Sequence, residues 1–497
     1  MEACRKYSAE LTYTVIALIL CVIMYGQFGL CWDGGIHLDN GERALSYFKQ
    51  GFDFNVFSEA PVKNIIYYPP TTDILTSLFI KNFSADPVSA RNFVTSLFWA
   101  FTFFPTLNIA RRLSGKFGTA AAWLSGLILL LNPTFLGHGF INPKDIPLAC
   151  VLMWFILSLM LERPLLEKLI LQGFSFGAIL MMRPGAAIFG ALLLIQLVKS
   201  RSLHGLIVFL GTCTLGWLCM IVIWPYAHQD IIFNPIRGFM QNIQFPEVYQ
   251  VHYFGHEFQS NSLPWHYIFG ILLVTMPIAT IALCLLGLGL QTLRPRSKGI
   301  YLLASLLIPI AGFIATGSNL YGGLRHLLFL YPILSIYAGI ASAWLISKPR
   351  WFYLIIPVLV LPIFSILQLH PYQYIYTNKL ADPRHFELDY WALTFREAAE
   401  YLNVEAGPND KVFVYANFLG KASFQHYYKH PENVVFVIDR TDTNSSLPDT
   451  MPDGLTYFVD AIGPKRQTPM FRNSPIIHTI NRMGVPICYI RKNNKKM

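Results

Sequence analysis

Four short polar segments interrupt an otherwise apolar sequence of 497 residues. The first, "CWDGGIHLDNGER", places Asp33 directly after an apolar run, and the two glycines that follow allow a sharp backbone turn. The others are "GHGFINPKDIPLA", "YGGLRH" and "FELDYW", which contain His138, Lys144, Asp145, Arg325, His326, Glu387 and Asp389. Each segment borders an apolar run, so a folded helical bundle could bring these side chains together.

These residue types suit an enzyme that attacks a sugar held at a membrane by a lipid phosphate. A carboxylate near the membrane surface can act as a base toward the attacking hydroxyl. Cations, a metal ion or helix N-termini can stabilise the phosphate that leaves. Asp33 and Asp145 are candidates for the first task, and Lys144 and Arg325 for the second.

Three of these side chains also have plain structural interpretations. Asp33 could cap the following helix or mark the membrane surface. Asp145 could be a helix N-cap with Pro147 in the first turn, where proline is tolerated. Arg325 could extend its guanidinium to lipid headgroups as an anchor. Capping does not exclude a functional role.

The remaining polar side chains have similar alternatives. His138 could be a packing residue, and Glu387 and Asp389 could organise the start of the C-terminal tail. His252 and His256 in "VHYFGHEF" have i, i+4 spacing, but the segment lacks the glutamate at the second position of a zincin motif. We therefore interpret these two histidines as loop or substrate-channel residues.

The composition predicts a membrane protein. Hydrophobic residues make up 54% and charged residues 13% of the chain, and the mean hydropathy is +0.43; soluble proteins carry roughly a quarter charged residues. The net charge of +10 lies in short clusters, which argues against nucleic-acid binding. The eight cysteines show no CxxC spacing, so they indicate neither a disulfide framework nor a metal site. We predict about eleven spans of adequate length, near residues 9–30, 92–110, 118–136, 146–162, 168–182, 186–199, 204–224, 265–290, 298–316, 326–347 and 351–369.

Basic residues predict the orientation. If the N-terminus is cytoplasmic, the loops on that side hold fourteen Lys and Arg residues, whereas the short loops on the opposite side hold only Lys144, Arg183, Arg237 and Arg325. Such a bias in short loops sets the topology of polytopic proteins. We therefore expect the N-terminus inside and the tail outside.

The expected fold is an α-helical polytopic membrane protein with a small extracytoplasmic α/β C-terminal domain. A transmembrane module covers residues 1–370, and its outer loop at 31–91 includes an interfacial helix in "NGERALSYFKQGFDF". Residues 371–497 form the α/β domain. There the amphipathic segment "TFREAAEYLNV" precedes the strand-like runs "KVFVYAN", "NVVFVIDR", "LTYFVDAI" and "PICYIRK".

The acidic residue after the first span, together with "NPKDIP" and "LRHLLFLYP", resembles the C-type superfamily of polytopic glycosyltransferases, which use lipid-phosphate sugar donors. The superfamily includes the dolichyl-phosphate-mannose protein mannosyltransferases and the bacterial aminoarabinose transferases. The stretch "HPYQYIYTNKL" with "FELDYWALTFREAAEYL" is similar to a bacterial branch of it. The resemblance covers most of residues 1–400, and it implies the bacterial inner (plasma) membrane.

The resemblance implies transfer of a hexose or pentose from a polyprenyl-phosphate donor to a glycan, lipid or protein acceptor on the outer side. Asp33 takes the place of the superfamily's catalytic acid. The family often has Asp-Glu there, whereas this chain has Asp33-Gly34, which leaves open a role for Asp39 or Glu42. Asp145 matches a second acidic residue in the next outer loop.

By the same resemblance, several outer residues would bind the donor phosphate or another part of the substrate: Lys144, Arg325, His326, His138 and Glu42. A divalent metal ion, if one is used, would be held by Asp33 and Asp145. Metal dependence varies across the superfamily, so the resemblance does not decide it.

The competing interpretation is a transporter or flippase of lipid-linked sugars. Such a protein needs ionisable groups in the middle of its spans, or paired broken helices in two repeated halves. Interior charges are scarce in this sequence and no repeat is visible. The "MMRPG" break is the one feature that favours transport.

Overall fold

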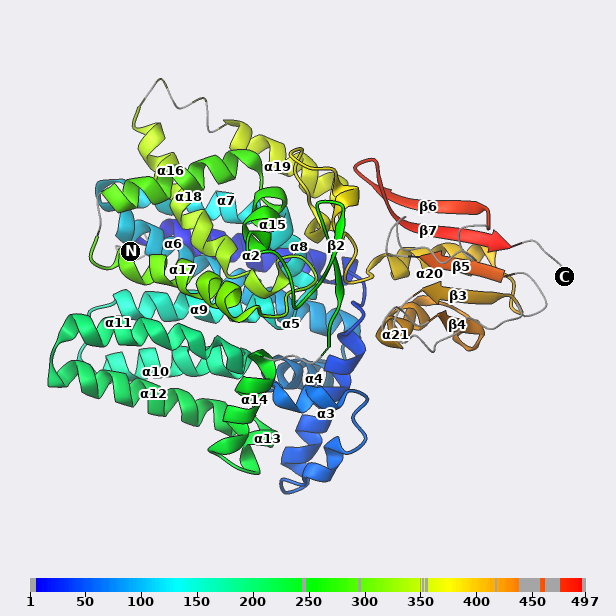
Figure 1. Cartoon of the computed structure of the whole chain (residues 1–497), viewed down its shortest axis with the longest axis horizontal. Coiled ribbons are helices and arrows are strands. Elements are labelled where there is room, and N and C mark those ends of the chain that lie inside the picture. Colours follow the sequence, from blue (N-terminus) through cyan, green and yellow to red (C-terminus); the bar gives the residue numbers. More distant parts are fainter. Residues whose placement is uncertain are drawn as a thin grey trace.

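The computed structural model describes residues 6–493, apart from 244–246, 294–295, 349, 351–352, 354–355, 416–417, 438–455 and 461–473. Helices form most of the chain, and a β-sheet lies near its C-terminus (Figure 1). The first half contains α2 (Ser8–Met24), α3 (Gly34–Lys49), α4 (Thr71–Phe83), α5 (Pro87–Phe101), α6 (Phe103–Ser114), α7 (Gly118–Leu130), α8 (Pro133–Ile141), α9 (Asp145–Met160), α10 (Leu165–Met182), α11 (Ala191–Ser200) and α12 (Leu203–Ile223).

The second half begins with short elements that lead into further apolar helices. These are α13 (Pro225–His228), α14 (Phe233–Ile243), β1 (Gln250–Tyr253), β2 (His256–Gln259), α15 (Tyr267–Thr275), α16 (Ile278–Leu293), α17 (Gly299–Thr316), the 3-10 turn η6 (Arg325–Leu327), α18 (Leu330–Ile346) and α19 (Ile356–Leu369). The tail contains α20 (Thr394–Glu405), β3 (Lys411–Tyr415), α21 (Phe418–Tyr427), β4 (Val434–Val437), β5 (Thr456–Asp460), β6 (Ile476–Arg482) and β7 (Val485–Asn493).

The helices agree with a membrane protein, but not with a count of eleven full spans. Within the described ranges, five helical stretches are long and apolar enough to cross a membrane, or six if one bent pair forms a single span. Four further apolar helices are shorter. The prediction of about eleven spans is therefore not confirmed as a number, although every predicted range contains at least part of a helix.

One predicted span is broken in the structure. The range 265–290 divides into α15 and α16 at Pro277. Met276, the residue before this proline, has extended backbone angles of φ −113° and ψ 148°. Proline disfavours helical angles in the residue that precedes it, so the break has a local cause.

The segment "GHGFINPKDIPLA" is more helical than predicted. The loop expected between residues 136 and 146 is largely replaced by α8, which extends to Ile141. This helix begins because the Asn132 side chain accepts a hydrogen bond from the Phe135 N–H at 2.9 Å and Pro133 occupies the first turn. The chain then bends by 111° between α8 and α9. The bend places Lys144 and Asp145 at a helix junction.

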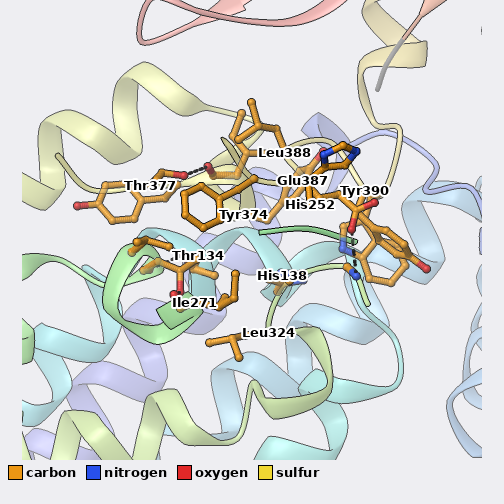
Figure 2. A pocket seen from close by; sticks show the side chains of 18 of the residues that line it. Thr134, His138, His252, Ile271, Leu324, Tyr374, Thr377, Glu387, Leu388 and Tyr390 are labelled. Atoms are coloured by element: carbon orange, nitrogen blue, oxygen red, sulfur yellow. Dashed lines mark hydrogen bonds between the residues drawn. The ribbon is translucent and has the colours of Figure 1, made fainter. Parts of the chain in front are cut away.

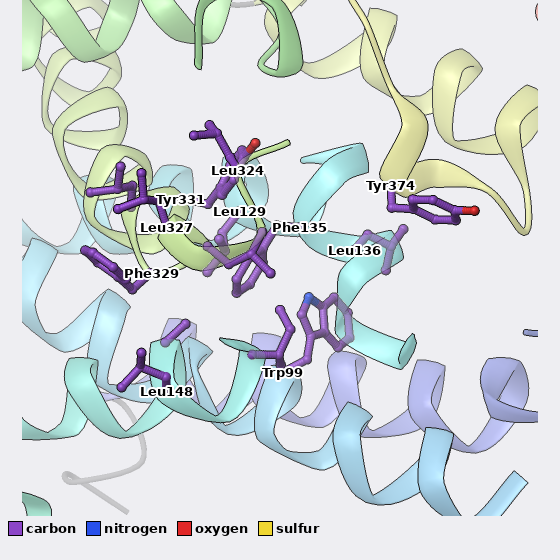
Figure 3. Close-up of a cluster of buried hydrophobic side chains, with 14 of the residues drawn as sticks. Trp99, Leu129, Phe135, Leu136, Leu148, Leu324, Leu327, Phe329, Tyr331 and Tyr374 are labelled. Atoms are coloured by element: carbon purple, nitrogen blue, oxygen red, sulfur yellow. The ribbon is translucent and has the colours of Figure 1, made fainter. Parts of the chain in front are cut away.

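The core lies where α5, α7, α8 and α18 meet. Figure 3 shows Trp99, Phe135 and Tyr331 among the side chains that fill this region. Small residues let α7 and α18 approach closely: a Cβ added to Gly339 would lie 2.0 Å from Ser125 Oγ. This packing gives the polar segments a rigid support.

Cations predicted to be cytoplasmic gather at the end of the bundle where α2 begins. Arg111 forms two 2.7 Å hydrogen bonds with the buried Glu10 carboxylate. Lys298 Nζ lies 2.7 Å from a Glu162 carboxylate oxygen, and Lys199 donates to the Ser297 carbonyl at 2.6 Å. Asp33 follows the opposite end of α2, so these cations and the candidate base lie at different ends of one helix.

The tail forms a five-stranded mixed sheet of order β4-β3-β5-β7-β6. Strand β3 pairs in parallel with β4 and β5, whereas β7 is antiparallel to β5 and β6. The four predicted strand runs overlap β3, β4, β5 and β7, and the predicted helix is α20. The sequence analysis missed α21 and β6. The domain boundary at residue 371 stays a prediction.

The tail contacts the chain just before Asp33. The Leu30 N–H donates to the Tyr427 hydroxyl at 2.8 Å, and the Leu30 carbonyl accepts from Ser423 Oγ. Both side chains belong to α21. The Trp32 N–H also donates to the Trp391 carbonyl at 3.1 Å. These bonds tie the link between α2 and α3 to the tail.

Candidate active site

Asp33 lies at the start of α3 and keeps a partly exposed carboxylate. The side chain makes no capping hydrogen bond, so the capping interpretation is wrong. Cys31 Sγ donates to Asp33 Oδ1 at 2.9 Å, and Arg91 Nη2 lies 3.8 Å from the same oxygen. His37 Nε2 is 3.9 Å from Oδ2. With 23% of its side chain exposed, Asp33 is accessible to a substrate hydroxyl.

The charges around Asp33 keep it ionised. Burial alone would raise the pKa of this carboxyl. The guanidinium groups of Arg91 and Arg325, together with the His37 ring in its protonated form, outweigh the effect of burial, and the pKa lies below its usual value. The carboxylate is therefore available as a proton acceptor at neutral pH.

Asp145 is the first residue of α9 and not its N-cap. The Asn142 side chain has the capping role, since its Oδ1 accepts from the backbone N–H groups of Lys144 and Asp145 at 3.2 and 3.0 Å. Asn142 Nδ2 also donates to Asp145 Oδ2 at 2.9 Å. Arg183 Nη1 lies 3.1 Å from Asp145 Oδ1. The Asp145 carboxylate is thus held on both oxygens.

Lys144 lies within electrostatic reach of the Asp33 and Asp73 carboxylates. Its Nζ is 4.0 Å from the centre of the Tyr68 ring, a cation–π contact. Burial lowers the pKa of Lys144 to about 8, against the opposing effect of the Asp73 and Asp33 charges. The ammonium group is therefore close to its titration range at mildly alkaline pH.

Arg325 is buried, with 8% of the residue exposed, so it does not extend to headgroups as an anchor. Its guanidinium lies over three aromatic rings, those of Tyr321, Tyr390 and Trp391, at 4.3, 4.9 and 5.3 Å. Among the described residues, none places a carboxylate within 4 Å of it, and its Nε has no hydrogen-bond partner there. Asp33 and Asp145 are close enough to interact with it electrostatically. Arg325 is thus a desolvated cation with donors to spare.

A cavity adjoins this aromatic cage, and Tyr390 and Trp391 line both. Figure 2 shows His138, Tyr374 and Tyr390 around the cavity. The His138 ring contacts the Tyr374 and Trp391 rings edge to face, with centroid distances of 5.9 and 6.2 Å. His138 Nδ1 is buried, and the described residues give it no hydrogen-bond partner. The cavity combines aromatic faces with hydroxyl, imidazole and carboxylate groups.

Two predicted substrate-binding residues lie differently. Glu42 is exposed on α3, and none of the contacts described around Asp33 involves it. The structure therefore does not bring Glu42 to the cluster. His326 is buried beside Arg325, with its ring 5.0 Å from that of Tyr321. Asp39 forms a 2.7 Å ion pair with Arg43 on α3.

The tail carboxylates have structural partners. Asp389 is buried and accepts hydrogen bonds from Tyr374 and from the backbone of Leu393 and Thr394, so it organises the start of α20. Glu387 accepts from the Gly322 N–H at 3.2 Å. These contacts agree with the interpretation of both residues as organisers of the tail junction.

The two loop histidines lie in a β-hairpin. His252 is in β1 and His256 in β2, so their i, i+4 spacing is not helical. His252 Nε2 lies 3.3 Å from a Glu257 carboxylate oxygen. His252 also lines the cavity.

Four residues near Asp33 and Asp145 were not predicted as part of the site: His37, Asp73, Arg91 and Arg183. Arg91 is 1% exposed and donates to Cys31 Sγ at 2.8 Å. The sequence signal for Arg91 and Arg183 is a lone arginine at the end of an apolar run. Asp73 is likewise a lone charged residue beside an apolar run, since it follows "YYPPTT" and precedes "ILTSLFI".

The sequence left open whether Asp33 and Asp145 hold a metal ion, and the described geometry around them does not form a metal site. Among the residues that the structure describes, no group of three or more His, Cys, Asp or Glu side chains could hold a metal ion. Asp145 instead pairs with Arg183, and Asp33 faces Arg91. The surrounding charge is that of cations, which suits an anionic ligand better than a metal ion.

Solved structures share this fold. ArnT from Cupriavidus metallidurans in the apo state, an aminoarabinose transferase, matches with a TM-score of 0.54 and 15% identity over 97% of both chains. The same protein bound to undecaprenyl phosphate gives 0.53 and 13%, again over 97% of both. The archaeal oligosaccharyltransferase AglB from Archaeoglobus fulgidus gives 0.49 and 13%, over 87% of this chain and 64% of that one. No protein-family model and no curated protein matches the chain. The mostly helical, ArnT-like fold that the resemblance implies is confirmed.

Proposed function

We propose that this chain is a glycosyltransferase that moves a sugar from a polyprenyl-phosphate donor to an acceptor hydroxyl on the extracytoplasmic side of a membrane. One observation carries the proposal. The Asp33 carboxylate and the caged Arg325 guanidinium interact at one end of a bundle with the ArnT fold. ArnT has been crystallised with undecaprenyl phosphate, which makes polyprenyl phosphates the first ligand class to test.

In the proposed reaction, the donor phosphate lies near Arg325 and Lys144. Asp33 takes the proton of the acceptor hydroxyl while the hydroxyl oxygen bonds to C1 of the sugar. The bond from C1 to the phosphate oxygen breaks, and its electron pair leaves with the lipid phosphate. The two cations stabilise the negative charge that builds on that phosphate. A single displacement inverts the configuration at C1.

The cavity beside the cage supports a substrate-binding role for His138. Aromatic faces with a few polar atoms are typical of ligand sites. The free Nδ1 of His138 can exchange a hydrogen bond with a sugar hydroxyl. Asp145 acts indirectly in this scheme, because its ion pair with Arg183 keeps the α9 junction, and hence Lys144, in place.

Transfer is favoured over transport because the candidate site residues lie at helix ends and junctions and not in the middle of a span. The test uses purified protein in proteoliposomes with a panel of polyprenyl-phosphate sugars labelled in the sugar. We expect the label to move to an acceptor while free polyprenyl phosphate accumulates. Protein-free liposomes are the control. Movement of the intact donor across the bilayer without a covalent product would establish transport instead.

Donor binding should depend on the protonation of Lys144. Its pKa of about 8 means that the ammonium form, which attracts phosphate, is lost as the pH rises through that value. We expect kcat/KM for the donor to fall above about pH 8, because this ratio reports ionisation of the free enzyme. In Lys144→Arg the guanidinium stays charged, so the decline should move to higher pH. Identical pH profiles for the two proteins would remove Lys144 from phosphate binding.

A further inference from the structure

A histidine lies between two carboxylates beside the candidate base. His37 is on α3, and 5% of its side chain is exposed. Its Nδ1 lies 3.1 and 3.2 Å from the two carboxylate oxygens of Asp73. Its Nε2 lies 3.9 Å from Asp33 Oδ2. The imidazole therefore connects a buried carboxylate to a partly exposed one.

The orientation of this imidazole is fixed by α4. Asp73 is 4% exposed and also accepts a hydrogen bond from Asn40 Nδ2 at 2.7 Å. Helices α3 and α4 are so close that a Cβ on Gly41 would lie 2.3 Å from the Asp73 carbonyl oxygen. Because Nδ1 donates its hydrogen to Asp73, the neutral ring has an unprotonated Nε2 that faces Asp33.

Asp33 by itself is a poor place to leave a proton. The Arg91 and Arg325 cations favour its ionised form, and a carboxylate stabilised in this way is a weak base. An imidazole is intrinsically more basic than a carboxylate. A carboxylate such as Asp73 stabilises the imidazolium that forms when Nε2 takes up a proton. The pair behind Asp33 thus supplies the basicity that Asp33 lacks.

We propose that His37, oriented by Asp73, is a positioning residue that accepts from Asp33 the proton taken from the acceptor hydroxyl. This inference rests on the proposed transfer reaction. The Asp33 O–H bond breaks and an N–H bond forms at His37 Nε2, which regenerates the Asp33 carboxylate. The proton leaves to water after product release. Rotation of the Asp33 side chain or one bridging water closes the 3.9 Å separation.

The test uses His37→Asn in the full-length protein, because an asparagine amide can still donate to Asp73 but offers no group at the Nε2 position. We expect kcat to fall by about 10²-fold while KM for the donor is unchanged, since the loss concerns proton transfer and not binding. Asp73→Asn should have a similar effect. The kcat of the double variant should be no lower than that of the less active single variant, because the two residues act as one unit.

His228→Asn is the matched control. His228 also tethers α3, through a 2.9 Å hydrogen bond between its Nδ1 and the Tyr47 hydroxyl. This variant should keep wild-type kcat. If His37→Asn keeps wild-type kcat, the relay is wrong although transfer stands. If His37→Asn does not fold, Asp73→Asn tests the relay independently, and wild-type kcat in that variant would exclude it. Absence of transfer by the wild type in the same assay would overturn the proposed function itself.

Discussion

Replacing Asp33 by asparagine is expected to lower kcat by about 10²–10⁴-fold, the range typical for loss of a general base. The substitution keeps the size of the side chain and removes the charge that accepts the hydroxyl proton. Binding of the donor phosphate should weaken little, because the negative charge of Asp33 repels the phosphate and its removal takes that repulsion away. The effect should therefore appear in kcat and not as a raised donor KM.

Two measurements distinguish this outcome from misfolding. The thermal unfolding midpoint of Asp33→Asn in detergent should stay close to that of the wild type, because Arg91 keeps its hydrogen bonds to Cys31 and to the Ile141 carbonyl. Asp33→Glu, which returns a carboxylate at a shifted position, should recover part of the rate. Transfer at the wild-type rate by Asp33→Asn would exclude Asp33 as the base.

Replacing Arg325 by methionine should lower kcat/KM for the donor by about 10²–10³-fold, comparable to the loss of one donor that stabilises developing negative charge. Methionine keeps an unbranched apolar side chain inside the aromatic cage. The kcat/KM of Arg325→Lys should lie between the values for the wild type and Arg325→Met, because an ammonium keeps the charge but lacks the planar set of N–H donors.

Stability provides the contrast that makes the Arg325 prediction specific. The guanidinium is buried without a carboxylate partner among the described residues, so its removal relieves a desolvation cost. We expect the unfolding midpoint of Arg325→Met to stay unchanged or rise while activity falls. Arg237→Met, at an exposed arginine of α14, is the control that should change neither quantity. A destabilised protein with normal transfer would assign Arg325 to the structure and not to the donor site.

The sequence was sufficient to predict that the candidate site residues lie at one end of the bundle. Each of them adjoins an apolar run, and Lys and Arg are unevenly distributed between the loops on the two sides. That reasoning put Asp33, Asp145 and Arg325 on the same side. The structure brings Asp33 and Asp145 each within electrostatic reach of Arg325. Their chemical roles stay predictions.

The sequence did not reveal how the charges pair. Asp145 forms an ion pair with Arg183, and His37 a hydrogen bond with Asp73; both contacts join segments whose relative packing no local pattern specifies. Breaks between helices are easier to predict from the sequence. The dipeptide Asn132-Pro133 has the residues of an N-cap followed by a first turn. It marks the start of α8, which lies across the end of the predicted span 118–136 and the loop after it.

The hydrogen bonds between α21 and Leu30 make the surroundings of Asp33 depend on the order in which the chain is synthesised. A nascent chain inserts its first helices and exposes Asp33 long before Ser423 and Tyr427 leave the ribosome. Until those two residues have docked, the Leu30 backbone lacks both of its hydrogen bonds to α21, and only the Trp32–Trp391 bond described above joins the tail to this link. If Asp33 is the base, as proposed, its surroundings are complete only after α21 has been synthesised.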